Sequence, residues 1–76
     1  MNERPLTLGE RRVRISFNPS TNPLVDEIKK CSAYLIDLMG TIDTNGDPET
    51  ELTVARARLK YEEGSEAAVK AATAGK

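Results

Sequence analysis

Four side chains in the first part of the chain have the chemistry needed to bind a small anion that carries a flat ring. Arg12, Arg14 and Lys29 can donate hydrogen bonds to phosphate oxygens, and Phe17 offers a ring on which a base could stack. They fall around one corner, where the N-terminal segment meets the first predicted helix. We therefore treat this corner as a candidate site for recognising a phosphate group and a base.

Each of these residue types also has a purely structural explanation. Phe17 could be a hydrophobic anchor that holds the N-terminal segment against the helices. Arg58 and Tyr61 repeat the pairing of a cation with a ring, but Tyr61 falls within a packing stripe of its own helix. Lys30 follows Asp26 by four residues, a spacing typical of an exposed ion pair on a helix. Lys29 has only a weaker explanation of this kind, through Asp26 three residues before it.

The composition gives little support for catalysis or for metal binding. The 76 residues include no histidine and a single cysteine, Cys31. A disulfide framework within the chain is therefore excluded, and the composition argues against a zinc site and against a Cys–His nucleophile. Glu62 and Glu63 would point about 100° apart on a helix and would not converge as a catalytic pair. We predict a protein that is not an enzyme and that needs no cofactor or metal.

The charge and hydropathy of the chain limit its surroundings and its partners. The formal net charge is −1, so no overall positive field favours duplex nucleic acid. No stretch is apolar for long enough to span a bilayer, and the lone cysteine suits a reducing compartment. We expect a soluble, cytoplasmic protein without a membrane partner. Single-stranded nucleic acid is an alternative ligand, because the first fifteen residues carry four arginines against two glutamates.

The pattern of residues predicts an all-α fold built as a two-helix antiparallel hairpin with an extended N-terminal arm. Proline after a capping residue marks both helix starts, at Asn22-Pro23 and at Asp47-Pro48. Val13, Ile15 and Phe17 alternate with polar residues, which favours an extended segment, although a helical turn at 8–13 is an alternative. The predicted boundaries are an arm at 1–17, helices at 23–39 and 48–72, a turn at 40–47 and a frayed tail at 73–76.

The apolar residues of the predicted helices form more faces than one hairpin can cover. In the first helix, one stripe contains Leu24, Ile28, Cys31, Leu35, Leu38 and Met39. Val25 and Ile36 form a second, narrower strip beside it, with Lys29 at its border. The second helix carries a stripe of mostly small residues, namely Val54, Ala57, Tyr61, Gly64, Ala68 and Ala72. Because two helices share only one interface, we expect the second strip and the small-residue stripe to be covered by other copies in a closed homo-oligomer.

Several segments between Arg12 and Thr73 resemble, in order and spacing, the phage anti-defence family of cyclic-nucleotide sponges. They are Arg12-Val13-Arg14, Phe17-Asn18-Pro19-Ser20, Val25-Asp26, Ile28-Lys29, Leu35-Ile36-Asp37, Pro48-Glu49-Thr50 and Ala68-Val69-Lys70-Ala71-Ala72-Thr73. Known members of that family counter the bacterial CBASS and Thoeris systems. The chain departs from the family at Gly64-Ser65-Glu66-Ala67, where members often carry bulky apolar side chains.

The resemblance implies a helical hairpin assembled as a homohexamer that binds cyclic dinucleotides between neighbouring protomers. Carried onto this sequence, it implies that Phe17 stacks on a base and that Lys29 contacts the phosphates. Some members bind cyclic trinucleotides in separate pockets through an arginine of the last helix, here Arg58. Relatives that act on Thoeris capture cyclic ADP-ribose isomers. The competing hypothesis is a self-assembling hairpin that serves as a protein-interaction module and binds no nucleotide.

Overall fold

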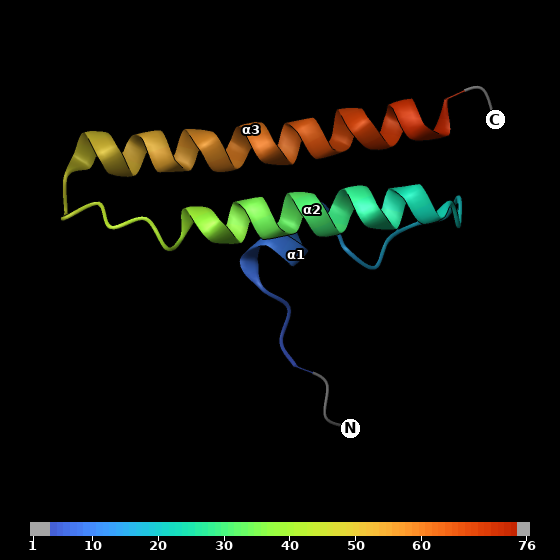
Figure 1. The fold of residues 1–76 in the computed structure, drawn as a ribbon, viewed down its shortest axis with the longest axis horizontal. Helices are drawn as coiled ribbons and strands as arrows, with labels where there is room; N and C mark the ends of the chain where they lie inside the picture. The colour runs from blue at the N-terminus through green and yellow to red at the C-terminus, as the bar shows by residue number, and fades with distance from the viewer. Residues whose placement is uncertain (1–3, 75–76) are drawn as a thin grey trace.

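The computed structural model describes residues 4–74, and this part of the chain forms three helices and no strand. They are α1 (Leu8–Val13), α2 (Pro23–Met39) and α3 (Pro48–Thr73). Figure 1 shows α2 and α3 side by side and running in opposite directions, with α1 packed against α2. The prediction of an all-α fold is confirmed. The predicted fraying of residues 75 and 76 lies outside the described residues.

The two long helices begin where the capping residues predict. The side chain of Asn22 accepts a hydrogen bond from the Leu24 N–H at 3.0 Å, and that of Asp47 accepts one from the Thr50 N–H at 3.0 Å. Each cap is followed by a proline, which needs no hydrogen-bond acceptor at this position. α2 has the predicted bounds, and α3 ends one residue beyond its predicted end, at Thr73. No helix among residues 4–74 is long and apolar enough to cross a membrane.

The alternation of apolar and polar residues predicts an extended N-terminal segment, but part of this segment is helical. The segment Leu8–Val13 is helical, and the predicted extended conformation over 12–17 is therefore wrong. A capping box starts α1: the Thr7 hydroxyl accepts from the Glu10 N–H at 3.1 Å, and the Glu10 carboxylate accepts from the Thr7 N–H at 2.9 Å. Arg14 then ends the helix in the left-handed conformation, with φ 57°. The helical alternative at 8–13 is the one observed.

Glu10 also accepts two hydrogen bonds from the guanidinium of Arg4, at 2.6 and 2.7 Å. These bonds, followed by the bond from the Thr7 N–H, lower the pKa of Glu10 from 4.5 to about 2. The carboxylate form therefore favours the folded state above pH 4.5, and this contribution is lost as the pH falls from 4.5 towards 2.

Arg4→Ala should raise the pKa of Glu10 towards 4.5 without restoring it fully, because the bond from Thr7 remains. An NMR titration of the Glu10 side-chain carboxyl carbon measures this value. Arg11→Ala is the control, since Arg11 instead donates to the Leu6 carbonyl, at 3.1 Å. An unchanged pKa in Arg4→Ala would show that the Arg4–Glu10 pair does not form in solution.

The buried core involves all three helices and includes the α2 strip that was predicted to be uncovered. The buried apolar side chains are Val13, Val25, Ala33 and Ile36. Val25 and Ile36, predicted to be uncovered within one chain, are 1% and 0% exposed. The prediction was wrong because Ile36 packs in a cluster with Val13 of α1, and because Val25 lies with Val69 and Thr73 of α3 around a shared pocket. Leu8 and Tyr61 pack against this cluster from α1 and α3.

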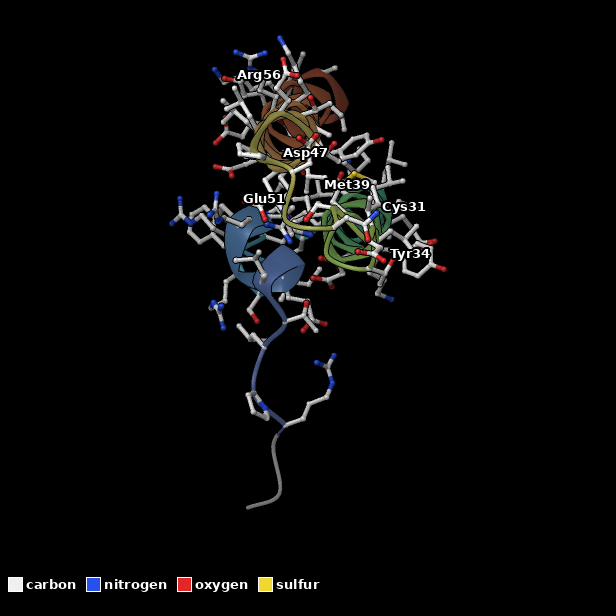
Figure 2. All side chains as sticks on the ribbon, turned by 90° about the vertical axis from the view of Figure 1, so that its left-hand side faces the viewer. Cys31, Tyr34, Met39, Asp47, Glu51 and Arg56 are labelled. Atoms are coloured by element: carbon white, nitrogen blue, oxygen red, sulfur yellow. The ribbon has the colours of Figure 1, made fainter. Side chains whose placement is uncertain are left out.

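The larger predicted stripe of α2 is open to solvent at three of its six residues, while Ile28, Leu38 and Met39 are half-buried. Leu24 is 54% exposed, Leu35 is 37% exposed, and Cys31 between them is also exposed. Figure 2 shows Cys31 and the neighbouring Tyr34 projecting from α2 on the side away from α1. We call Leu24, Cys31 and Leu35 the open strip. A single protomer therefore leaves apolar side chains of α2 without a partner.

The small-residue stripe of α3, also predicted to be uncovered, is largely occupied within the chain. Its members Val54, Ala57, Tyr61, Ala68 and Ala72 are half-buried, and Gly64 is exposed. Tyr61 packs against the core, which supports the packing explanation for this ring. The open strip of α2 is one apolar surface that self-association could cover, and Leu52 and Leu59 of α3 are exposed as well.

Candidate functional site

Lys29 lies inside the protomer and not at the border of an uncovered surface. Its side chain is buried, with the residue 6% exposed. The ammonium donates to the carbonyl of Arg14 at 3.0 Å and to the carbonyl of Phe17. An ammonium has three N–H donors, so one is left for another acceptor. Lys29 thus fixes the segment after α1 and keeps a single donor for a ligand.

The surroundings of Lys29 disfavour the protonated, charged form of its side chain. Burial lowers the pKa of its ammonium, the nearby charge of Arg14 lowers it further, and Asp26 acts in the opposite direction. A bound phosphate would add negative charge beside this group and would therefore favour its protonated form.

Phe17 lies beside two cations and keeps much of its ring accessible. The guanidinium carbon of Arg14 is 4.3 Å from the ring centroid, and the Lys29 ammonium is 5.4 Å from it. Both distances are within the range of a cation–π contact. Phe17 is 50% exposed, which is more than a simple hydrophobic anchor requires. Stacking of a base on this ring stays a prediction that the geometry permits.

These residues line one pocket between α1, the segment that follows it, α2 and α3. The pocket has a volume of about 220 Å³. Arg12, Arg14, Phe17 and Lys29 contribute to it from the N-terminal half of the chain, and Ser65, Glu66, Val69 and Lys70 contribute from α3. The fold thus brings together four of the five predicted binding residues. Together with Lys70, it concentrates positive charge around an accessible ring.

Arg12 is already engaged within the protomer. Its guanidinium pairs with the carboxylate of Glu62 at 3.2 Å and so connects α1 to α3. Both side chains are partly exposed, so the pair contributes little to stability, about 0–1 kcal/mol. Its main effect is to position α1 beside α3 at the mouth of the pocket. Arg12 is therefore less free to bind an anion than Arg14 is.

Arg58, the fifth predicted residue, lies away from this pocket. It lines a different one, together with Gly40, Ile42, Thr44 and Glu51 at the turn between α2 and α3. Its Nε is buried and has no hydrogen-bond partner among the described residues. The structure does not bring Arg58 together with the other four predicted residues. Any ligand role for it belongs to a separate site.

The predicted ion pair between Asp26 and Lys30 is wrong, although Lys30 is exposed as expected. Lys30 pairs with Glu27 at 3.9 Å, and both side chains are about 70% exposed. Asp26 instead accepts a hydrogen bond from the Asn18 amide at 3.1 Å. Lys29 and Lys30 are adjacent in sequence but differ completely in environment, which makes them a natural pair for mutagenesis.

Sequence reasoning missed the contribution of α3 to the pocket. Ser65 is 4% exposed and Lys70 lies five residues further on, but neither is marked by a local motif. The available signal was the absence of a large side chain at Ser65, in the stretch that departs from the family pattern. Among residues 4–74, no group of three or more Cys, Asp or Glu side chains could hold a metal ion.

Comparisons with known protein families, with curated proteins and with solved structures found no match.

Proposed function

We propose that the protein is a phage anti-defence sponge that binds cyclic oligonucleotide second messengers and does not turn them over. The observation that carries this proposal is the gathering of Arg14, Lys29 and Lys70 around the half-exposed ring of Phe17. Cations suit the phosphates of such a ligand, and the ring suits its bases. By lowering the free concentration of the messenger, the protein would block CBASS-type or Thoeris-type signalling in the host bacterial cytoplasm.

The segments from Arg12 to Thr73 that resemble the sponge family add support and widen the list of ligands. Cyclic dinucleotides come first, followed by cyclic trinucleotides and cyclic ADP-ribose isomers. The pocket, at about 220 Å³, is below the range of roughly 300–1,000 Å³ usual for sites that enclose a drug-sized ligand. A neighbouring copy could enclose the part of a cyclic dinucleotide that one protomer leaves outside. A ligand between protomers, as in the family, agrees with this size.

Recovery of the ligand distinguishes a sponge from an enzyme. The protein is incubated with a cyclic dinucleotide, the complex is denatured by heat, and the released ligand is analysed by mass spectrometry. A sponge removes the ligand from free solution and returns it unchanged after denaturation. Linear or hydrolysed products in the protein sample, and not in the buffer control, would contradict the proposal.

Assembly as a homo-oligomer, which the family resemblance suggests is a hexamer of helical hairpins, belongs to the same proposal. The open strip of Leu24, Cys31 and Leu35 supports self-association, because exposed leucines gain free energy when they are covered, about 1.5–3 kcal/mol for each fully buried side chain. The same strip also supports the alternative function, a hairpin that serves only as a protein-interaction module.

Leu24→Glu should weaken assembly and shift light-scattering profiles towards the monomer. The substitution suits the first turn of α2, where a negative charge is favourable, so the helix itself should be retained. Thr53→Glu is the control, because Thr53 is exposed on α3 and is not an apolar side chain. Equal masses for the wild-type protein and Leu24→Glu at all concentrations would contradict a role for the open strip in assembly.

A further inference from the structure

One carboxylate lies in the otherwise cationic pocket. Glu66 lines it together with Arg14, Lys29 and Lys70. Lys70 follows Glu66 by one helical turn, yet no ion pair joins Glu66 to a cation among residues 4–74. Glu62, on the preceding turn of α3, is by contrast paired with Arg12. Glu66 is exposed, and it therefore presents a carboxylate with free hydrogen-bonding capacity in the pocket that Phe17 also lines.

A carboxylate in this place lowers the affinity for phosphate, because it repels the ligand's negative charges. It becomes favourable only if the ligand also brings hydrogen-bond donors. Guanine presents two parallel donors, N1–H and the N2 amine, which match the two oxygens of a carboxylate. Adenine presents one amine beside the ring acceptor N1, and uracil presents one N–H between two carbonyls. Among the common bases, guanine alone offers an edge that a carboxylate can bind in bidentate fashion.

We propose that Glu66 determines base specificity and selects cyclic nucleotides that contain guanine. This inference rests on the proposed function. A base stacked on Phe17 directs its N1–H and N2 amine to the Glu66 carboxylate. The ammonium groups of Lys29 and Lys70 hold the adjoining phosphates. The preferred ligand class is thus a cyclic dinucleotide or trinucleotide with at least one guanine.

Isothermal titration of the wild-type protein and Glu66→Gln, each with cyclic di-GMP and cyclic di-AMP, tests this inference. The wild type should bind cyclic di-GMP about tenfold more tightly or better, the discrimination expected of a bidentate contact to a base. Glu66→Gln should weaken binding of cyclic di-GMP by a similar factor. The affinity of the same variant for cyclic di-AMP should be unchanged or higher, because a repelling charge is removed. Glu63→Gln is the control, since Glu63 is exposed on α3 and outside the pocket.

The opposite responses of the two ligands separate base recognition from a general charge effect. If Glu66→Gln tightened binding of both ligands, Glu66 would act only by repulsion, and the inference would be overturned. Equal affinities of the wild type for both ligands would also overturn it, while leaving the sponge function intact. If folded protein bound neither ligand, nor any other cyclic nucleotide, both the proposed function and this inference would fail.

Discussion

Lys29→Met is expected to weaken cyclic-nucleotide binding by about 10- to 150-fold, the equivalent of one lost hydrogen bond to a charged group. The substitution removes the one donor of the ammonium that is not bonded to the protein. It also releases the carbonyls of Arg14 and Phe17, which Lys29 now holds. The ring of Phe17 should then be less well placed for stacking, so the loss should lie towards the upper end of this range.

The adjacent residue provides the matched control for this experiment. Lys30→Met removes the same charge from the same helix but from an exposed side chain whose partner is Glu27. Its affinity for the ligand should stay within about twofold of the wild type, as expected for an exposed and screened charge. Circular dichroism should show α2 and α3 intact in both variants. If Lys29→Met and Lys30→Met bound the cyclic nucleotide with equal affinity, Lys29 would not be part of the binding site.

The structural role of Lys29 predicts a separate loss of stability. In Lys29→Met the half-buried carbonyl of Phe17 loses its donor, whereas the carbonyl of Arg14 keeps the hydrogen bond from the Phe17 N–H at 2.8 Å. A buried acceptor left without a partner costs about 1–3 kcal/mol. Arg14 also holds a left-handed backbone, with φ 57°, that is unfavourable for a residue with a side chain. Urea denaturation should therefore show a lower free energy of unfolding for Lys29→Met than for Lys30→Met.

Gly9→Ala should destabilise the protein by about 1–3 kcal/mol, the usual cost of inserting a methyl group into a closely packed contact. A Cβ at Gly9 would lie 2.1 Å from the carbonyl oxygen of Ala33, which belongs to the backbone of α2 and cannot rotate away. α1 would have to move, and the hydrogen bond from the Gly9 N–H to Asp37, 2.8 Å long, would lengthen. Because Arg12 and Arg14 lie at the end of α1, ligand affinity should fall as well.

Gly64→Ala is the control, and its effect should have the opposite sign. No atom lies within 4 Å of a Cβ built at Gly64. Alanine in the middle of a helix is favoured over glycine by about 0.8–1.0 kcal/mol, so the variant should be more stable in urea. If Gly9→Ala were as stable as the wild type, the close contact between α1 and α2 would not exist in solution.

The parts of the fold governed by local chemistry could be predicted from the sequence. Asn22 and Asp47, each followed by proline, determine where α2 and α3 begin, and both act as caps in the structure. The start of α1 also has a local signal, because Thr7 and Glu10 have the spacing of a capping box. The alternation of apolar and polar residues towards Phe17, by contrast, favours an extended segment.

Which side of α2 is buried could not be predicted from the residues of α2 alone. Half of its larger apolar stripe is exposed, whereas Val25 and Ile36 of the narrower strip are buried inside the protomer. That packing depends on Gly9 meeting Ala33, a contact between residues far apart in the chain. The candidate site could likewise be predicted only in part. The spacing of Arg14, Phe17 and Lys29 in the sequence indicates that they lie close together, but the contribution of α3 is known only from the three-dimensional fold.

Isothermal titration of the wild-type protein with cyclic dinucleotides, cyclic trinucleotides and cyclic ADP-ribose isomers tests the sponge function most directly. The protein should be folded and its mass should first be measured by light scattering. We expect saturable binding of at least one cyclic dinucleotide, with a stoichiometry set by sites shared between protomers. Folded, assembled protein that releases no binding heat with any of these ligands at several temperatures would contradict the sponge function and favour the interaction module.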